Sequence, residues 1–381
     1  MKMDNQVKEI LDREIKRQNT TIELIASENY ASQAVMELCG SIFTNKYAEG
    51  YPGKRYYNGC DHMDEIEQLA IDNVCKLYDC NFANVQPHSG VNANTAVYQA
   101  LMNPGDTLMG MDLASGGHLS HGAPPTLSGK VYNAVTYGVD ENGLLNYEEI
   151  RALAKVSQPN VIVAGASAYP RQINWAAFKD IADGVGAYLV VDMAHYSGLV
   201  AGKAYDSPLP YADVVTSTTH KTLRGPRGGM ILWNDERYTK KINSAIFPGT
   251  QGGPLMNIIA AKAQCYAEAL EPEFETYAKQ VVKNAQAMAL SLTQYGISVL
   301  TEGTDSHIIL IDLRDCKYSG RQAADLLEAK GITVNKNGIP NDPRNFVETS
   351  GIRIGTAAET TKGNMEYWFR ELAQKIANLL Q

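Results

Sequence analysis

The sequence predicts an α/β fold: a large domain built on a mostly parallel sheet of about seven strands, followed by a smaller α+β domain. The first observation is that short apolar runs alternate with helical patterns from residue 84 to residue 233, as in a sheet covered on both faces. The second is the length, because 381 residues suffice for one large and one smaller domain. We expect a helical arm (1–40), a large domain (41–270) and a small domain (271–381).

The elements of the large domain follow from their residue patterns. Apolar runs predict strands at 107–111, 161–164, 188–191, 214–216 and 229–233. Amphipathic spacing predicts helices at 147–156 and 175–185, between successive strands. The charged and amphipathic N-terminus, residues 1–18, predicts a helix that packs on another surface, such as a partner subunit.

The C-terminal part reads differently. A long helical pattern runs from 255 to 295 and is interrupted at 271–272 by a glutamate and a proline. Strands follow at 307–313, 332–334 and 352–354, with helices at 320–330 and 365–380. We place the domain boundary within 269–277.

Composition excludes several classes of function. A net charge of −8 with no basic run argues against a nucleic-acid binder. No apolar stretch reaches membrane-spanning length, and the N-terminus lacks a signal-peptide core. The six cysteines show neither CxxC spacing nor grouping with histidines. We therefore expect a cytoplasmic protein with reduced thiols and no metal.

The segment 216–229, TSTTHKTLRGPRGG, places Lys221 just after an expected buried strand. Arg224 and Arg227 follow it closely. Neighbouring positive charge and partial desolvation both lower the pKa of a lysine, as an imine-forming amine requires. A lone lysine after a strand is usually a solvated surface residue, so the other motifs decide between these readings.

A carboxylate is expected beside that lysine. The run GAYLVVDMAH, 186–195, ends a probable strand at Asp192, 29 residues before Lys221. This spacing fits a neighbouring parallel strand, and ligands bind at the carboxyl edge of such sheets. An amine and a carboxylate placed there suit pyridoxal phosphate, whose aldehyde the lysine binds while the carboxylate keeps the ring nitrogen protonated. Taken alone, an aspartate at this position more often caps the following turn.

A third motif, PHSGVNANTAVYQALM at 87–102, runs from small polar residues into a helical pattern. The free N–H groups of a helix N-terminus bind phosphate. Ser89 and Gly90 are therefore candidate phosphate ligands. An ordinary N-cap explains Ser89 as well.

Taken together, these motifs resemble the serine hydroxymethyltransferase family, which are pyridoxal-phosphate enzymes of fold type I. The resemblance covers nearly the whole chain and is carried by IELIASENYAS, TNKYAEGYPGKRYYNGCDHMDEIEQLAID, ANVQPHSG, GGHLSHG, VVDMAH, TTHKTLRGPRGG, FPGTQGGPLM, TVNKN and TSGIRIGT. It implies reversible conversion of serine and tetrahydrofolate to glycine and 5,10-methylenetetrahydrofolate.

The resemblance also implies roles for individual residues. The implied catalytic residues are Lys221, Glu49, His220, Asp192 and Tyr57. The implied cofactor-binding residues are Ser89, Gly90, His118, Ser167, Asp192, His195, His220, Lys221, Gly253 and Tyr47. The implied substrate-binding residues are Ser27, Tyr47, Glu49, Tyr57 and Arg353. The implied folate contacts are Glu49, Tyr56, Leu113, Gly117 and Asn337.

The same resemblance implies that the active sites are shared between subunits. Tyr47, Glu49 and Tyr57 are expected to enter the neighbouring subunit's site, and Gly253 is expected to come from the partner. We therefore expect a homodimer, with pairing of dimers into tetramers left open. On the residues alone, a tyrosine-rich loop that packs into the core is the favoured interpretation, because aromatic residues in loops commonly serve packing.

Several positions depart from the family pattern and keep alternatives open. Val91, Pro170 and Asn257 replace residues that the family usually carries, and the loop 344–348 lacks its usual proline. A folate-independent aldolase for β-hydroxy amino acids, or a hydroxymethyltransferase acting on α-methylserine or alanine, is the alternative function. An aminotransferase is disfavoured because no second arginine is placed for a side-chain carboxylate. A binding or regulatory homologue is disfavoured by the intact Lys221 and Asp192.

Overall fold

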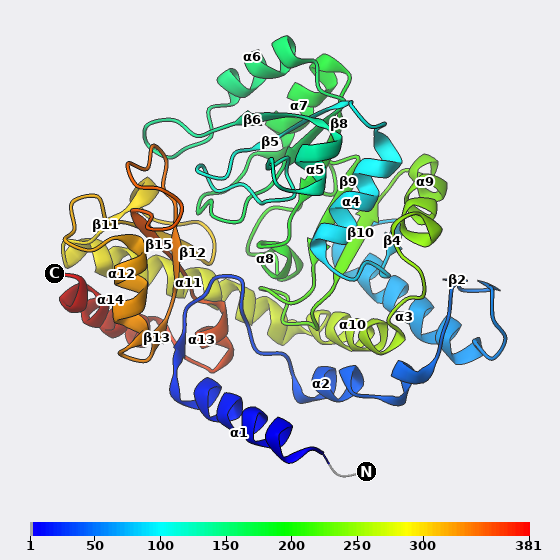
Figure 1. Ribbon diagram of the computed structural model, residues 1–381, viewed down its shortest axis with the longest axis horizontal. Coiled ribbons are helices and arrows are strands. Elements are labelled where there is room, and N and C mark those ends of the chain that lie inside the picture. The colour runs from blue at the N-terminus through cyan, green and yellow to red at the C-terminus, as the bar shows by residue number, and fades with distance from the viewer. Residues whose placement is uncertain (1–2) are drawn as a thin grey trace.

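The computed structural model describes residues 3–381 and contains two main β-sheets with helices around them (Figure 1). The larger sheet has seven strands in the order β4-β10-β9-β8-β7-β5-β6. Neighbouring strands run parallel except at β10, which is antiparallel to both β4 and β9. The predicted α/β class with a mostly parallel seven-stranded sheet is confirmed. The strands are β4 (Phe82–Asn84), β5 (Thr107–Met111), β6 (Asn133–Tyr137), β7 (Val161–Ala164), β8 (Tyr188–Asp192), β9 (Val214–Thr218) and β10 (Gly229–Trp233).

Helices follow most of these strands and cover both faces of the sheet. The expected helices at 147–156, 175–185, 320–330 and 365–380 all form, within a few residues of the expected ends. The helices are α1 (Asn5–Thr20), α2 (Gln33–Cys39), α3 (Asp61–Tyr78), α4 (Gly90–Leu101), α5 (Leu127–Val131), α6 (Tyr147–Ser157), α7 (Trp175–Val185), α8 (Ser197–Ala201), α9 (Thr239–Ser244), α10 (Met256–Ala269), α11 (Pro272–Gln294), α12 (Gly320–Glu328), α13 (Ala357–Thr361) and α14 (Glu366–Leu380).

The alternation of side chains along each strand sends neighbouring residues into different cores. Val190 and Val214 enter a core that they share with Ala93 of α4. Val191 and Val215 enter the larger core on the opposite face, to which α3 and α10 contribute. Since both faces of the sheet are buried, these central strands are nearly continuous hydrophobic runs. Such runs predict strands from the sequence alone.

The second sheet is antiparallel and has the strand order β11-β12-β15-β14. Its apolar face packs with side chains of α11, α12 and α14. The predicted strand at 332–334 forms as β13, but it pairs with β1 near the N-terminus and not with this sheet. The remaining strands are β1 (Ile22–Glu23), β2 (Gly50–Tyr51), β3 (Lys54–Arg55), β11 (Ser298–Val299), β12 (Ile308–Asp312), β13 (Ile332–Thr333), β14 (Asn335–Asn337) and β15 (Gly351–Gly355).

The predicted N-terminal helix is present as α1, which projects from the rest of the chain in Figure 1. Asp4 caps it by accepting hydrogen bonds from the N–H groups of Gln6 and Val7. No residue of this helix, 5–20, is buried. Val7, Ile10 and Ile15, which are all about half exposed, recur at helical spacing. The single chain therefore leaves an apolar helix face uncovered.

The interruption predicted at 271–272 is also observed. Helix α10 ends at Ala269, and α11 begins with Pro272 at its first position, where a proline costs no hydrogen bond. The division of the chain into arm, large domain and small domain stays a prediction. No helix within residues 3–381 combines the length and the apolar character needed to cross a membrane.

Candidate active site

A polar cavity of about 510 Å³ lies where β8 and β9 end. It brings together many of the residues that the sequence singled out, from both halves of the chain. The predicted residues that line it are Ser27, Ser89, Gly90, His118, Ser167, Asp192, His195, His220, Lys221 and Arg353. Glu28, Val91, His121, Ala166, Ala194, Thr218 and Arg227 complete the lining.

Lys221 lies three residues beyond β9 and is only 8% exposed. Its Nζ donates a hydrogen bond of 3.2 Å to Oγ1 of Thr218. Burial lowers the pKa of Lys221, the attraction of Asp192 opposes that shift, and the positive charges of Arg353 and Arg227 add to it, so that the pKa is about 8. Arg224, the other expected neighbour, stacks instead over the ring of Tyr277 at 4.1 Å. Near neutral pH, a larger fraction of this amine is therefore in the neutral, nucleophilic form than for an ordinary lysine.

Asp192 is the last residue of β8, and its backbone is paired with Thr216 of the adjacent parallel strand β9. Its Oδ2 accepts hydrogen bonds of 2.9 Å from Nδ2 of Asn94 and from Nε2 of His121. Its Oδ1 accepts a third, of 3.1 Å, from the N–H of Ala194. Burial acts to raise the pKa of Asp192, but these donors hold it below its usual range. Asp192 is thus an ionised carboxylate in a buried position.

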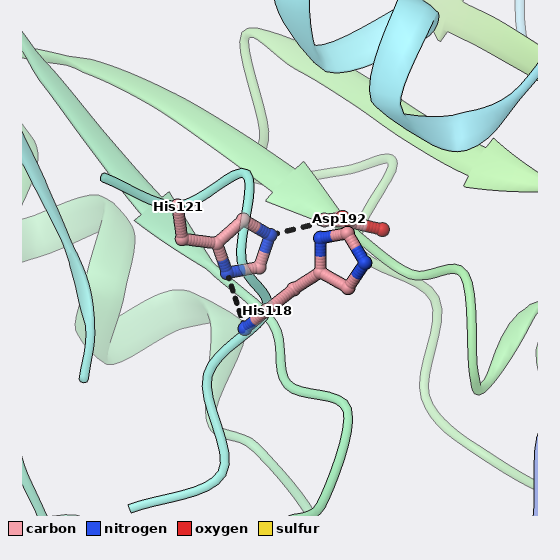
Figure 2. Close-up of side chains that lie close together, drawn as sticks. All are labelled: His118, His121 and Asp192. Carbon is pink, nitrogen blue, oxygen red and sulfur yellow. Dashed lines mark hydrogen bonds and ion pairs between the residues drawn. The ribbon is translucent and has the colours of Figure 1, made fainter. Parts of the chain in front are cut away.

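Figure 2 shows how two histidines of one loop approach Asp192. His121 points its Nε2 at the carboxylate, while the N–H of His118 lies 3.4 Å from Nδ1 of His121. Nδ1 of His118 lies 2.7 Å from Oγ of Ser120. Burial lowers the pKa of His118 to about 4, so its ring is a neutral imidazole at neutral pH. The ring therefore carries no charge that would repel a neighbouring cation.

Sequence reasoning missed His121 as a site residue, although it is the second histidine of the motif GGHLSHG. Potential ligand atoms of His118, His121 and Asp192 lie within 4.8 Å of one another, a spacing that also suits a metal ion. Hydrogen bonds already join His121 to Asp192 and His118 to Ser120, however. The arrangement serves to hold Asp192 ionised.

His195 stacks on a second histidine that the sequence did not single out. Its ring is nearly parallel to that of His307, with centroids 5.5 Å apart. Nδ1 of His195 lies 3.4 Å from Nε2 of His307, which in turn lies 3.1 Å from the carbonyl oxygen of Ala26. Burial lowers the pKa of His195 well below its usual value and that of His307 to about 3. His307 starts an expected strand, and no local motif marked it as functional.

The N-terminus of α4 forms one end of the cavity. Ser89 caps the helix, its Oγ accepting a hydrogen bond of 3.2 Å from the N–H of Asn92. A Cβ on Gly90 would lie 2.7 Å from Cγ2 of Thr218, so only glycine lets the helix approach β9 this closely. Burial lowers the pKa of His220 to about 3, helped by the positive charges of Lys221 and Arg227. The helix dipole and Arg227 favour an anion at this end.

Arg353 enters the cavity from β15, a central strand of the antiparallel sheet. It is 9% exposed, and burial lowers its pKa to about 10, which leaves it a cation at neutral pH. Its Nε donates 3.0 Å to Oδ1 of Asn335, and its Nη1 donates 2.6 Å to the carbonyl oxygen of Ser167. These two bonds fix the plane of the guanidinium, whose remaining N–H groups suit a carboxylate.

A second group of predicted residues lies outside this cavity. The rings of Tyr47 and Tyr57 meet edge to face at 5.3 Å. A Cβ on Gly253 would lie 3.0 Å from Cζ of Tyr47, and one on Gly252 would lie 3.4 Å from Oε1 of Glu49. Tyr47 is 56% exposed and Tyr57 47% exposed, and the carboxylate of Glu49 raises the pKa of Tyr57. The single chain therefore splits the predicted site into two groups.

The predicted folate residues are also spread over several places. Leu113 lines a neighbouring cavity of about 620 Å³. His118 and His121 line both this cavity and the first one. Asn337 ends β14, and its Nδ2 donates to the carbonyl oxygen of Gly338. The N–H of Gly117 bonds to the carbonyl oxygen of Asp112. Tyr56 is 73% exposed beside Phe247.

The chemistry of the cavity fits pyridoxal phosphate. A buried amine with a lowered pKa, an ionised carboxylate and a neutral imidazole line the same space. The capped start of α4 supplies a place for a phosphate. With a mostly parallel seven-stranded sheet and a following antiparallel sheet, these features define the class of pyridoxal-phosphate enzymes of fold type I.

Comparison with known proteins identifies the family within that class. A family model described as serine hydroxymethyltransferase matches residues 1–376. A serine hydroxymethyltransferase of Wolbachia pipientis wMel is 56% identical over 379 residues, which is 99% of this chain and 89% of the relative. One of Rickettsia typhi (strain ATCC VR-144 / Wilmington) is 57% identical over 379 residues, 99% of this chain and 90% of the relative. The chain belongs to the serine hydroxymethyltransferase family.

Proposed function

We propose that this protein converts serine and tetrahydrofolate reversibly to glycine and 5,10-methylenetetrahydrofolate, with pyridoxal phosphate as cofactor. Membership of the serine hydroxymethyltransferase family implies that cofactor and that one-carbon acceptor. The observation that carries the proposal is the single cavity in which Lys221, Asp192 and Arg353 meet. The amine, the buried carboxylate and the substrate-binding guanidinium have distinct tasks there.

Lys221 provides the attachment point for the cofactor. When bound, pyridoxal phosphate supplies an aldehyde that condenses with amines and a ring that accepts electron density from the substrate α-carbon. Because the pKa of Lys221 is about 8, a measurable fraction of Nζ is unprotonated near neutral pH. An ordinary lysine, with a pKa near 10.4, is almost fully protonated there.

Asp192 supplies a fixed negative charge in the same cavity. Three donors, from Asn94, His121 and Ala194, keep its carboxylate ionised despite burial. A buried negative charge stabilises a proton on a nitrogen placed beside it, since the low local dielectric strengthens their attraction. Asp192 therefore holds the ring nitrogen of the cofactor in its protonated form.

Arg353 binds and orients the amino-acid substrate. Its planar guanidinium is suited to grip the α-carboxylate with two parallel hydrogen bonds, and Ser27 adds a nearby hydroxyl. Because Asn335 and Ser167 fix the guanidinium, the substrate is held in one orientation. Such positioning lowers the activation barrier, because the reacting groups are already held in the required orientation within one complex.

We further propose that the protein is a homodimer with shared active sites, in which Tyr47, Glu49, Tyr57 and Gly253 serve the partner's cavity. Their grouping outside the cavity of their own chain supports this, as do the largely exposed tyrosine rings. The uncovered apolar face of α1 supplies a further surface that a partner would bury. In this proposal Glu49 takes up the proton of the substrate hydroxyl, and Tyr56, Leu113, Gly117 and Asn337 join it in contacting folate.

A cytoplasmic location forms part of the proposal. All six cysteines are free thiols, although Cys75 and Cys80 are near neighbours in sequence and in space. Thiols of this kind persist in a reducing compartment. The relatives named above are bacterial proteins.

The test is glycine production from serine by the purified protein, with and without tetrahydrofolate. The proposal expects glycine to form at a useful rate only when tetrahydrofolate is present, with one methylene group transferred for each glycine. Glycine released from allo-threonine at a comparable rate without folate, and none from serine with it, would contradict the proposal and identify a folate-independent aldolase. Turnover of α-methylserine in place of serine would contradict the choice of donor.

A further inference from the structure

Lys262 is a buried cation that the active-site description does not use. It lies on α10 with 1% of its surface exposed, among the most deeply buried charged side chains of the described chain. Its Nζ contacts three backbone carbonyl oxygens, those of Val85 at 2.6 Å, Pro87 at 3.1 Å and Gly229 at 2.8 Å. It does not line the cavity, so it acts only through the segments that it holds.

The contacts show which form of Lys262 the structure uses. Three carbonyl oxygens require three N–H donors, and only the ammonium form of lysine has three. Burial lowers the pKa of Lys262 to about 7, and the buried carboxylate of Glu67 opposes that shift. Hydrogen bonds to the charged form favour that form. A charged, fully bonded ammonium group therefore lies behind the loop that precedes α4.

The three carbonyl groups belong to two segments that meet at the end of the cavity. Val85 and Pro87 lie in the stretch leading to Ser89 and Gly90, and Gly229 starts β10. The N–H of Gly229 also bonds to the carbonyl oxygen of Pro87 at 3.0 Å. Lys262 thus fastens the loop before α4 to the strand beside it.

Two glycines make this arrangement possible. A Cβ on Gly228 would lie 2.6 Å from Cε of Lys262. A Cβ on Gly229 would lie 2.3 Å from the carbonyl oxygen of Ser89. Glycine is therefore required at both positions, because the Lys262 side chain lies too close to Gly228, and the loop before α4 too close to Gly229, for a Cβ atom. Any larger residue would push one of the two segments away.

We propose that Lys262 is a positioning residue for the phosphate end of the cofactor site. By holding the carbonyl groups of Val85, Pro87 and Gly229 from behind, it presents Ser89 and the N-terminus of α4 to the phosphate in a fixed orientation. Its positive charge adds to the favourable potential for an anion there. This inference rests on the proposed function, because it takes pyridoxal phosphate as the ligand.

The test compares two ligands that differ only in the phosphate. Apoprotein of the wild type and of Lys262→Met is titrated with pyridoxal phosphate and with pyridoxal, and the two dissociation constants are read from protein fluorescence. Methionine keeps an unbranched side chain of similar length but removes the charge and all three donors. We expect the preference for pyridoxal phosphate over pyridoxal to fall by about tenfold or more, the scale of one charge-assisted hydrogen bond. Lys279→Met, at a half-exposed lysine of α11, is the matched control and should keep the wild-type preference.

The outcomes separate a positioning role from a merely structural one. Equal weakening of both ligands by Lys262→Met, or an unchanged ratio, would overturn the inference while leaving the proposed function intact. A wild-type protein without any preference for the phosphorylated ligand would contradict the proposed function as well. Gly228→Ala gives a second route that retains the charge but crowds Cε of Lys262. Gly228→Ala should also lower the preference for pyridoxal phosphate over pyridoxal. If Lys262→Met does not fold, an unchanged preference in a folded Gly228→Ala protein would overturn the inference.

Discussion

Nε2 of His121 lies 2.9 Å from Oδ2 of Asp192, and both side chains are almost fully buried. The histidine comes from the loop after β5 and the aspartate from the end of β8. The hydrogen bond therefore connects segments that follow or end two strands separated in the sheet by β7. With Asn94 on the same oxygen, His121 is a main reason why a buried carboxylate keeps its charge. The electronic role assigned to Asp192 therefore depends on a second residue of the cavity lining, which hydrogen-bonds to its carboxylate.

Replacing His121 should impair catalysis more than folding. In His121→Phe the Oδ2 atom loses a charge-assisted hydrogen bond, so Asp192 holds a proton more readily and supports the ring nitrogen less well. We expect kcat to fall by about 10- to 100-fold, which corresponds to about 1.5–3 kcal/mol. Steady-state glycine formation measures it. His62→Phe, at a highly exposed histidine of α3, should leave kcat unchanged, and a wild-type kcat for His121→Phe would remove the histidine from the account.

The pH dependence of cofactor attachment should follow the ionisation of Lys221. Its pKa is lowered from 10.5 to about 8, so the reactive neutral amine increases as the pH rises and is mostly formed above pH 8. The rate at which apoprotein gains the visible absorbance of bound pyridoxal phosphate should therefore rise with pH and level off above about pH 8. In Arg227→Gln, which removes a cation that lowers this pKa, the midpoint should move to higher pH. A rate that keeps rising to pH 10 in the wild type would mean that Lys221 is an ordinary lysine.

Arg353→Lys should weaken binding of the amino acid. Lysine keeps the charge but cannot reproduce the planar pair of hydrogen bonds, and it loses the contacts to Asn335 and Ser167. We expect the KM for serine to rise by about 10- to 100-fold, equivalent to about 1.5–3 kcal/mol. Arg314→Lys, at an exposed arginine of the same half of the chain, is the control. An unchanged KM in Arg353→Lys would show that another group binds the carboxylate.

Val91 offers a gain-of-affinity test. Its side chain is 48% exposed and borders the cavity at the start of α4. Val91→Ser adds a hydroxyl donor near the expected phosphate and should tighten binding of pyridoxal phosphate by about fivefold, or about 1 kcal/mol. Equilibrium dialysis measures the change. Val156→Ser, at an exposed valine of α6, should have no effect, and weaker binding by Val91→Ser would place the phosphate elsewhere.

Mixing two inactive variants tests the shared sites. Glu49→Gln and Arg353→Ala should each be nearly inactive as homodimers. If Glu49 serves the partner's cavity, a hybrid dimer holds one site with both defects and one intact site, so a random mixture recovers about one quarter of wild-type activity. Mixing Arg353→Ala with Lys221→Ala is the control, because both residues line the cavity of one chain and every hybrid site stays defective. Recovery in the control but not in the test mixture would reverse the assignment.

Much of the fold was predictable because the central strands are buried on both faces. Strands β5, β7 and β10 have the predicted bounds, and β8 and β9 were predicted only slightly short. Two strands of the larger sheet were missed for physical reasons. Strand β6 lies at a sheet edge and alternates with polar residues, and β4 has only three residues. The partner of β13 was also missed, because pairing with β1 joins residues more than 300 positions apart.

The site was predictable where its residues follow strands or lie in distinctive motifs. Lys221 and Asp192 follow neighbouring strands, so their meeting follows from parallel topology. His307, by contrast, reaches His195 only through packing between the two halves of the chain. Lys262 lies in an apolar helix that carries no motif, and its role depends on backbone carbonyl groups that a sequence does not reveal. In the proposed homodimer, Tyr47 and Glu49 serve the cavity of a second chain, and one sequence cannot position two chains relative to each other.

The most direct measurement is to reduce the cofactor-loaded protein with borohydride and to locate the label by peptide mass spectrometry. Reduction makes the bond between the cofactor and its amine permanent. The account predicts a single phosphopyridoxyl group on Lys221, because this lysine lines the cavity together with Asp192 and has a lowered pKa. A label on another lysine, such as the buried Lys262, or a loaded protein without any label, would contradict it.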